Sequence, residues 1–355
     1  AFVASHDVDA PDAFNDGAWG DPGAMAMADM EKGEGVRGTY FITTDYVVGY
    51  YNEETVLELC DRGMCPAGGH SVQHLYWADM PLGTCQEVRA NYNPATPTVC
   101  GEVRVNLETL RATVPASTTL VSWRTPYLDV NGHQYDVLAA HGVRYDSSLG
   151  VGDVRTNFPF HMSVFPWLQE ELFHGHDMFE FPVVLEDGIG WYADGKEQRL
   201  ELTDRSWPVF RGLWRRTLLE NAANGAVTTL LVHPSQGVGP DAGTENVHNK
   251  IAAVQWAIQQ AKKSNMRVIQ MTELGDFWRA RRQVRMEAKW VPGAGYEGKI
   301  TVGSLPAPGL SFAFSDHIKS FECSGGGAVA IAEGRVAFKD TLAAGFSCAF
   351  TAKVQ

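Results

Sequence analysis

The stretch Val227-Thr-Thr-Leu-Leu-Val-His233 decides the fold class. It is an apolar run of strand length, which is typical of a strand buried on both faces in a parallel sheet. Segments with helical spacing precede and follow it, at residues 203–224 and 246–263. Because strand-like and helix-like segments alternate in this way through residues 1–284, the sequence predicts parallel strands covered by helices, which is an α/β fold.

The pattern changes near Gln283. Beyond it no helical spacing remains, and residues 285–355 form short alternating runs separated by turns that contain glycine and proline. We therefore expect two domains, a β/α barrel over residues 1–284 and a small, antiparallel, β-sandwich-like module over residues 285–355.

Composition and charge exclude several classes of protein. Hydrophobic residues make up 45% of the 355 residues and charged residues 20%, which is the usage of a globular protein. With 29 Lys and Arg against 42 Asp and Glu, the net charge is −13, which would repel a phosphate backbone, so we expect no nucleic-acid partner. No apolar run approaches the roughly 18 residues that a membrane span needs.

The six cysteines form three groups by their spacing, without the close Cys-x-x-Cys pairs of metal sites. The groups are Cys60 with Cys65, Cys85 with Cys100, and Cys323 with Cys348. We expect three local disulfides in a protein that is secreted or belongs to the periplasm or cell envelope. The alternative is six reduced thiols in a cytosolic protein. Because the chain begins at Ala1 without a signal peptide, we expect a processed form.

Two acids share one face at the end of the first strand-like segment, SHDVD at residues 5–9. Residues two apart in a strand point to the same side, so Asp7 and Asp9 point one way and His6 and Val8 the other. Two carboxylates on one face at the end of an inner strand destabilise the fold by mutual repulsion and loss of hydration, unless a bound cation or proton neutralises their charge. The alternative is a pair of loop carboxylates or a helix N-cap.

Two histidines follow a glycine-rich, strand-like segment. His70 and His74 of GHSVQH, residues 69–74, stand four positions apart. This spacing would place both on one face of a helical turn, where they could bind one divalent ion. The alternative is a histidine packed in the core.

Two further polar positions lie at strand ends. Arg124 follows the strand-like run at residues 118–123 and could pair with a carboxylate, while Pro126 would shape a turn whose Tyr127 amide faces the site. His233 ends the apolar run quoted above, where β/α barrels place their chemistry. The alternatives are an ordinary loop arginine with a structural proline, and a hydrogen-bonded terminal histidine.

Together these four motifs resemble the polysaccharide deacetylases of carbohydrate esterase family 4, the NodB homology domain, over most of residues 1–284. SHDVD resembles a variant of the family's first motif with one residue between the acids, and His-Ser-x-x-His, Arg-x-Pro-Tyr and Leu-x-His match the others. The resemblance implies a distorted (β/α)7-8 barrel of the NodB type over residues 1–284, as the catalytic domain, with residues 285–355 as an accessory module.

The resemblance also implies a metal centre. Asp9, His70 and His74 would bind one divalent ion, which we expect to be zinc, with cobalt or another divalent ion as the alternative. Three protein ligands leave positions open, as in a catalytic rather than a structural zinc site.

The remaining motif residues would carry the acid–base chemistry of the family. Asp7 would be the base, held ionised by Arg124, and the amide of Tyr127 would stabilise the oxyanion. His233 would protonate the leaving group.

The acetyl group would bind in an apolar pocket formed by Leu231 and Trp191, next to Tyr127. The residue that pairs with the catalytic histidine stays open, because the usual family motif is only loosely represented by Glu186, Asp187 and Trp191.

We therefore expect a metal-dependent hydrolase that removes acetyl groups from a polysaccharide, either N-acetylated (chitin or peptidoglycan-like) or O-acetylated (xylan-like). One alternative is a hydrolase of a cyclic, non-sugar amide, because such enzymes share the SHDVD-type motif. The other is an inactive carbohydrate-binding protein. The sequence leaves the oligomeric state open.

Overall fold

The computed structural model describes residues 1–9, 22–44, 53–162, 176–193, 196–234, 245–332 and 334–354. The chain divides into two compact units, Ala1–Thr272 and Glu273–Gln355. The boundary lies in helix α8 (Met271–Arg282), earlier than the expected boundary after residue 284. That the first unit is a catalytic barrel and the second an accessory module stays a prediction.

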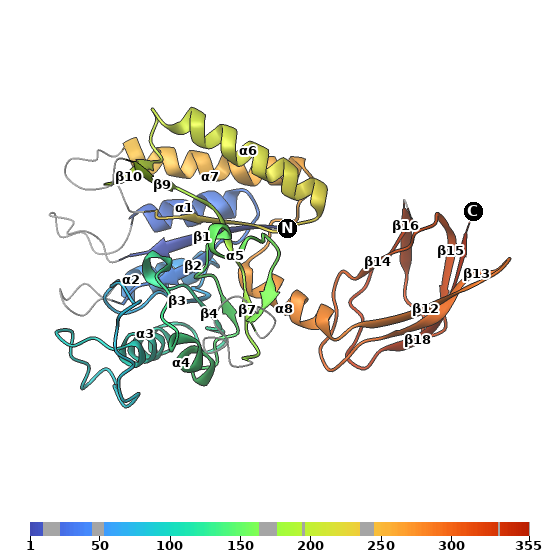
Figure 1. Ribbon diagram of the computed structural model, residues 1–355, viewed down its shortest axis with the longest axis horizontal. Coiled ribbons are helices and arrows are strands. Elements are labelled where there is room, and N and C mark those ends of the chain that lie inside the picture. Colours follow the sequence, from blue (N-terminus) through green and yellow to red (C-terminus); the bar gives the residue numbers. More distant parts are fainter. Residues whose placement is uncertain are drawn as a thin grey trace. The chain divides into compact units, whose positions relative to one another are not determined.

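Nine strands of the first unit's described residues form one sheet, in the order β6-β7-β5-β4-β3-β2-β1-β11-β8. All neighbours pair in parallel except β6, which runs antiparallel to β7. The strands are β1 (Phe2–Val8), β2 (Thr39–Ile42), β3 (Gly68–Gly69), β4 (Ser122–Trp123), β5 (Tyr145–Asp146), β6 (Phe160–His161), β7 (Phe179–Glu180), β8 (Val183–Glu186) and β11 (Thr228–Val232). The sheet curls into a half-barrel, which confirms the predicted distorted barrel of the NodB type (Figure 1).

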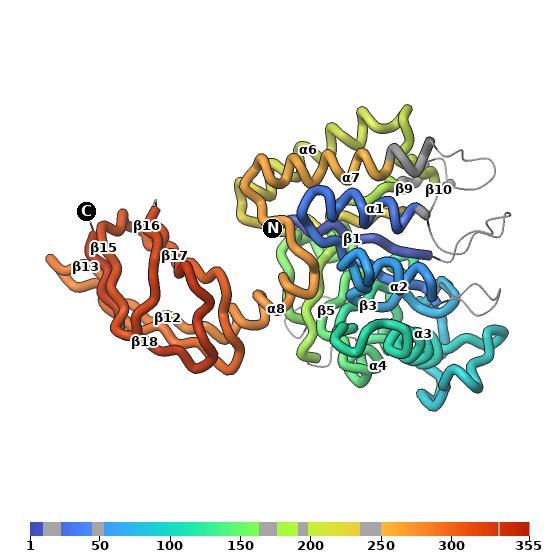
Figure 2. Tube along the Cα trace, turned by 180° about the vertical axis from the view of Figure 1, so that it is seen from behind, coloured from blue at the N-terminus to red at the C-terminus, as the bar shows by residue number. Residues whose placement is uncertain are grey.

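Helices cover the sheet in a single row (Figures 1 and 2). Neighbouring helices contact each other in the order α6, α7, α1, α2, α3, α4. Their bounds are α1 (Pro22–Gly33), α2 (Glu53–Asp61), α3 (Val99–Thr113), α4 (Gln134–Ala140), α6 (Trp207–Asn224) and α7 (Glu245–Lys263), with a short α5 (Val151–Val154) and a 3-10 turn η1 (Pro126–Leu128). Buried apolar side chains fill the space between this row and the sheet.

Strand β1 shows how the sheet separates its two faces. Ala4 and Val8 pack in apolar clusters with the helices, and His6 bonds Glu31 of α1 through Nε2 (2.8 Å). Asp7 points to the opposite face, where it meets Arg124. The period-two alternation expected for residues 5–9 is therefore present, and it places the acids inside the curl of the sheet.

Two local features go beyond the alternation of strands and helices. Residues 267–271, which follow α7, contribute only an isolated bridge from Val268 to Phe2. After β8 the chain forms a hairpin, β9 (Gly188–Ala193) and β10 (Lys196–Glu201), that the sequence pattern did not indicate.

The second unit consists of two antiparallel sheets, ordered β12-β13-β18-β15 and β14-β17-β16. The strands are β12 (Arg285–Val291), β13 (Gly295–Thr301), β14 (Ser311–Ala313), β15 (Ile318–Cys323), β16 (Val329–Ala332), β17 (Arg335–Phe338) and β18 (Ser347–Val354). Their alternating apolar side chains share one core, as expected for a small β module.

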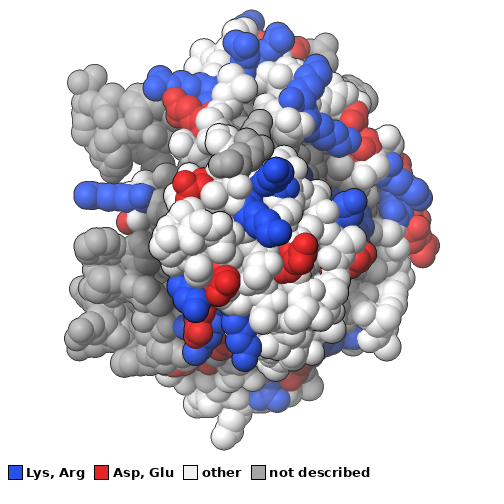
Figure 3. All heavy atoms as spheres, turned by 90° about the vertical axis from the view of Figure 1, so that its right-hand side faces the viewer, with Lys and Arg blue, Asp and Glu red and all other residues white. Residues whose placement is uncertain are grey.

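Disulfides join Cys60 to Cys65, Cys85 to Cys100 and Cys323 to Cys348, which is the grouping that the spacing predicts. None of the helices among the described residues is long and apolar enough to cross a membrane. On the face drawn in Figure 3, basic and acidic side chains of the described residues are interspersed.

Candidate active site

The candidate site lies at the carboxyl ends of neighbouring strands. Asp7 and Asp9 come from the end of β1, and His70 follows β3, two strands away in the sheet. Because β1, β2 and β3 run in parallel, their carboxyl ends meet at one edge, and this brings together residues that are more than 60 positions apart.

The histidine segment is a loop rather than the expected helical turn. Ser71 and His74 both have positive φ, of 72° and 53°, and the Ser71 hydroxyl accepts a hydrogen bond from the His74 amide (3.0 Å). Buried Glu102 of α3 accepts two further bonds from the amides of Val72 and Gln73 (2.8 and 3.0 Å). The two imidazoles therefore converge because side chains hold the loop, and not because of helical periodicity.

Three donor atoms meet as predicted for a metal ion. Nε2 of His70 lies 3.4 Å and Nε2 of His74 3.3 Å from Oδ1 of Asp9, and ligand atoms of all three residues lie within 4.8 Å of one another. These distances exceed those of good N–H···O⁻ hydrogen bonds. The two distances from the imidazole nitrogens to Asp9 match the roughly 3.3–3.6 Å that separates ligands held 2.0–2.2 Å from a tetrahedral ion. The residues therefore fit a divalent ion.

The hydrogen bonds of His70 prepare it as a ligand. Its Nδ1 donates to the backbone carbonyl of Arg124 (2.7 Å), and a carbonyl can only accept, so Nδ1 carries the proton. Burial would lower the pKa of this ring, but Asp7 and Asp9 outweigh burial and raise that pKa, so a cation must displace a proton from Nε2 to bind there. In the neutral ring, Nε2 has a free lone pair. This nitrogen is buried and has no hydrogen-bond partner among the described residues. Such an outer hydrogen bond is the usual way in which proteins orient a metal-binding histidine.

The charge states of the other two donors also suit a cation. Burial lowers the pKa of His74 to about 4, so its ring is neutral at pH 7. Burial alone would raise the pKa of Asp9, but the surrounding histidines outweigh it and hold that pKa well below its usual value. A neutral imidazole and an ionised carboxylate are the forms that bind a metal.

Arg124 fixes Asp7 beside this centre, as the sequence predicts. Its Nη1 donates to Oδ1 of Asp7 (2.8 Å), and its other nitrogens bond Ser5 and Ser147. The guanidinium also lies over the ring of Phe41, 4.5 Å from its centroid. Each guanidinium nitrogen of Arg124 thus has a hydrogen-bond partner, which makes a buried ion pair tolerable in the interior.

The structure supplies the partner of His233 that the sequence left open. Nδ1 of His233 donates to Oδ1 of Asp187 (2.9 Å), which follows β8, and the His233 amide donates to Oδ2 (3.0 Å). Lys250 of α7, only 3% exposed, lies 2.7 Å from the same Oδ2 and also bonds the His233 carbonyl. The sequence contained one indication that Asp187 belongs to the site, namely its position directly after a buried strand. No local sequence pattern indicated that Lys250 belongs to it.

This network sets the protonation of the histidine. Burial favours the neutral ring, but Asp187 outweighs it and raises the pKa of His233 to about 9. The pKa of Asp187 itself lies far below its usual value: burial would raise it, but Lys250 and His233 more than compensate. His233 is therefore an imidazolium at pH 7, the state that a proton donor needs.

A cavity of about 330 Å³ opens over these groups. Of the predicted residues, its wall includes Asp7, His74, Tyr127, Leu231 and His233. Glu186, which the sequence offered only as part of a loosely matching motif, also lines it. So do five residues that the sequence did not single out: Tyr76, Leu128, Gly188, Gly190 and Arg199.

The remaining predictions concern the turn and the apolar pocket. Tyr127 lies in η1 with φ 58°, and half of its side chain is exposed. Leu231 is buried in β11 at the cavity wall. The side chain of Trp191 lies outside the described part of the chain, so its predicted role stays a prediction.

No family model and no curated protein matches the chain. Among solved structures, it is similar to a Mycobacterium smegmatis protein described as a polysaccharide deacetylase, with a TM-score of 0.54 and 20% identity over 79% of this chain and 90% of that one. Weaker similarities include the chitin deacetylase of Colletotrichum lindemuthianum (TM-score 0.43, 14% identity, 77% of this chain and 85% of that one) and a family 4 carbohydrate esterase of Streptomyces lividans (0.38, 14%, 75% and 91%). The chain therefore shares its fold with the Mycobacterium smegmatis protein that is described as a polysaccharide deacetylase.

Proposed function

We propose that the first unit is a metal-dependent hydrolase that removes acetyl groups from a polysaccharide. The observation that carries this proposal is the convergence of Asp9, His70 and His74 beside an arginine-bound carboxylate, Asp7, and a carboxylate-bound imidazole, His233. The fold, shared with a protein described as a polysaccharide deacetylase, supports the choice of substrate class.

Asp9, His70 and His74 would hold one divalent ion. Two imidazoles with one carboxylate favour zinc or a similar transition metal over magnesium and calcium, which prefer oxygen ligands alone. Bound there, such an ion supplies Lewis-acid polarisation of an acyl carbonyl and lowers the pKa of a water.

Asp7 would take the proton of the attacking water. Its Oδ1 is occupied by Arg124, so Oδ2, which lies 3.6 Å from Nε2 of His70, is the oxygen that remains for this proton. The amide of Tyr127, at the wall of the same cavity, would donate to the oxyanion that forms.

His233 would donate a proton to the leaving amine or alkoxide. Since Nδ1 is bound to Asp187, Nε2 is the nitrogen available to the substrate. Leu231 would contact the acetyl methyl at the apolar part of the wall.

The experiment measures bound metal and acetate release together, on chitooligosaccharides, peptidoglycan, acetylated xylan and cyclic amides. We expect about one zinc per chain, loss of metal and activity in His70→Ala, and retained metal with lost activity in Asp7→Asn. His133→Ala, at an exposed histidine outside the site, is the matched control.

Each other result has a defined meaning. Metal content that is unchanged in His70→Ala contradicts the ligand assignment, and a fully active Asp7→Asn contradicts the base. If the protein hydrolyses cyclic amides and none of the polysaccharides, its substrate is a non-sugar amide. If it binds metal and hydrolyses none of these compounds, it is an inactive carbohydrate-binding protein.

We further propose that the protein works outside the cytosol. Three disulfides are typical of a protein in an oxidising compartment, where a polysaccharide of the cell envelope or the surroundings would be its substrate. The second unit would serve as an accessory module.

A further inference from the structure

The two metal-binding histidines belong to a long irregular segment. Residues 70–98, all described by the structure, connect β3 to α3 and contain no helix or strand. Connections of this length are uncommon within a compact unit. One side of the segment walls a cavity of about 890 Å³ beside the catalytic one, and Tyr76 lines both. Because that side is open rather than packed, the position of the histidines depends on bonds that the segment makes elsewhere.

The backbone of the histidine loop, residues 70–74, has a conformation that needs support. Ser71 and His74 have positive φ, of 72° and 53°, in a region that residues other than glycine seldom adopt. Such a backbone persists only where the surrounding structure holds it. The bonds that hold this loop therefore decide how well the two imidazoles are placed for a metal ion.

Glu102 of α3, a fully buried side chain, makes two of these bonds. Its Oε2 accepts from the amides of Val72 and Gln73, at 2.8 and 3.0 Å, and its Oε1 accepts from the hydroxyl of Tyr92. The side chain of Gln73 also donates to the carbonyl of Pro94 (3.1 Å). Glu102 thus joins the histidine loop to the far end of the irregular segment, and the proposed acid–base chemistry makes no use of it.

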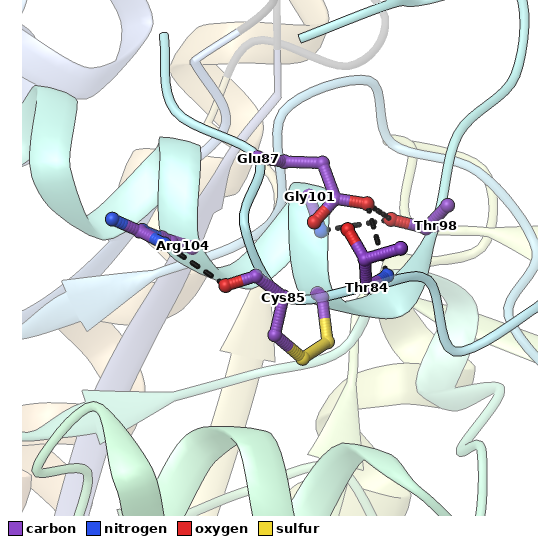
Figure 4. The surroundings of a disulfide bond; sticks show 7 residues. Thr84, Cys85, Glu87, Thr98, Gly101 and Arg104 are labelled. Atoms are coloured by element: carbon purple, nitrogen blue, oxygen red, sulfur yellow. Dashed lines mark hydrogen bonds between the residues drawn. A yellow bond between two sulfur atoms is a disulfide. The ribbon is translucent and has the colours of Figure 1, made fainter. Parts of the chain in front are cut away.

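A disulfide fixes the turn of α3 that carries Glu102 (Figure 4). It joins Cys85 of the irregular segment to Cys100, which is fully buried and lies two residues before Glu102. The carbonyl of Cys85 accepts from Nη1 of Arg104 (2.9 Å), and Thr98 caps the same end of the helix through a backbone amide (3.0 Å). The first turn of α3 is therefore tied covalently to the irregular segment, and Glu102 is held with it.

We propose that Glu102 is a positioning residue for the histidine loop and that the disulfide of Cys85 and Cys100 keeps it in place. Metal binding would then depend on the oxidation of this cysteine pair, a dependence that rests on the metal centre of the proposed function. The bond forms by exchange: the two thiols give two protons and two electrons to a second disulfide, which becomes two thiols. In a reducing compartment the site would bind metal weakly, and oxidation after export would complete it.

The first arm of the test measures the zinc affinity of the full-length protein in competition with a chelator. Glu102→Ala leaves the amides of Val72 and Gln73 without their acceptor, so we expect an affinity roughly 10- to 100-fold lower. Glu102→Gln keeps an oxygen for these amides, and a neutral group suits this position because burial already raises the pKa of Glu102. This conservative variant should bind zinc within about threefold of the wild type.

Cobalt in place of zinc separates positioning from stability. The visible absorption of bound cobalt depends on the arrangement of its ligands. In cobalt-saturated Glu102→Ala the shape of this spectrum should change, because the imidazoles are no longer held, whereas in Glu102→Gln it should match the wild type. A residue that only stabilised the fold would lower the melting temperature and leave the spectrum of the folded protein unchanged.

The second arm removes the disulfide. Cys85→Ala combined with Cys100→Ala should lower the zinc affinity about tenfold. The matched control is Cys60→Ala combined with Cys65→Ala. Cys65 lies only five residues before His70, but no hydrogen bond among the described residues joins either cysteine of this pair to the histidine loop. The control should therefore bind zinc as tightly as the wild type.

The results that would overturn the proposal are specific. A wild-type zinc affinity in Glu102→Ala, or an affinity in Glu102→Gln as low as in Glu102→Ala, overturns the role of Glu102. Equal affinities of the two cysteine double variants overturn the dependence on oxidation. Unfolding of the variant without Cys85 and Cys100 overturns it as well, because a redox-dependent metal site needs a folded reduced state.

Failure of the proposed function gives different results. If the wild type binds zinc but releases no acetate, the hydrolase assignment fails and the zinc affinities still decide about Glu102. If the wild type binds no metal, the metal centre and its dependence on oxidation fail together. Hydrogen exchange at the amides of Val72 and Gln73 then decides about the loop: equal protection in Glu102→Ala and the wild type overturns the role of Glu102.

Discussion

Replacing Asp187 by asparagine should move the pH range of the proposed hydrolase activity. The carboxylate of Asp187 is the group that outweighs burial and raises the pKa of His233 to about 9. Asparagine removes the charge but keeps a group of the same size. Without this charge, burial lowers the pKa of His233 and only the weaker influence of Asp9 and Asp7 raises it, so we expect the pKa to fall towards its ordinary 6.5.

The size of the effect follows from these two values. The difference between 6.5 and about 9 corresponds to about 3 kcal/mol in favour of the imidazolium, at roughly 1.4 kcal/mol per pH unit. With a pKa near 9 about nine-tenths of His233 is protonated at pH 8, and with a pKa of 6.5 only about 3% is. We therefore expect Asp187→Asn to lose about 30-fold in kcat/KM at pH 8 and less than about twofold, from this cause, at pH 6.

The assay is the pH dependence of kcat/KM for acetate release, from pH 5 to 10, with the melting temperature of each variant measured alongside. The alkaline limb reports the group that must be protonated. In Asp187→Asn this limb should move to lower pH.

Lys250→Met is the matched control. It removes the positive charge that lies 2.7 Å from Asp187 and leaves the carboxylate in place. The full charge of Asp187 then acts on His233, so the alkaline limb should move to higher pH. Opposite shifts cannot come from general loss of folding. An alkaline limb of Asp187→Asn that coincides with the wild-type limb would refute either the proton-donor role of His233 or its control by Asp187.

Three further changes test other parts of the structure. Burial raises the pKa of Asp146 from 3.8 to about 6 and also raises that of Glu180, so the folded state binds more protons than the unfolded state. The free energy of unfolding should therefore fall as the pH rises from about 4 through 6, and Glu180→Gln should flatten this slope in urea unfolding. A Cβ on Gly69 would lie 1.9 Å from Oδ1 of Asn106, which holds the histidine loop, so Gly69→Ala should weaken zinc binding in competition with a chelator. Cys323→Ser opens a 25-residue loop and should destabilise the second unit by about 3 kcal/mol in thermal unfolding.

Helix α3 shows where sequence patterns fail. No helix was predicted over residues 99–113, because its buried face includes polar side chains such as Glu102 and Asn106 as well as apolar ones. These two residues are buried because they bond the backbone of the histidine loop, which is a tertiary requirement. A helix that uses buried polar side chains to hold a loop therefore lacks the regular spacing of apolar residues from which a helix is predicted.

The sequence by itself determined the parts of this protein that depend on local geometry. Strand–helix alternation set the α/β class, and the period of two in a strand placed Asp7 and Asp9 on one face. The cysteine spacing indicated the disulfides because short loops close most readily. The motif residues indicated a metal site with a general base and a proton donor beside it.

Only the tertiary structure decided which of these residues meet. The order of strands in the sheet places β3 near β1, and it also joins β8 to β11, so that Asp187 reaches His233. Lys250 of helix α7 forms an ion pair with Asp187. Tyr76 lies in an irregular segment, and the path of this segment places its side chain at the wall of two cavities. Sheet order and loop packing are set by the burial of surface across the whole unit, and no local pattern of residues contains that information.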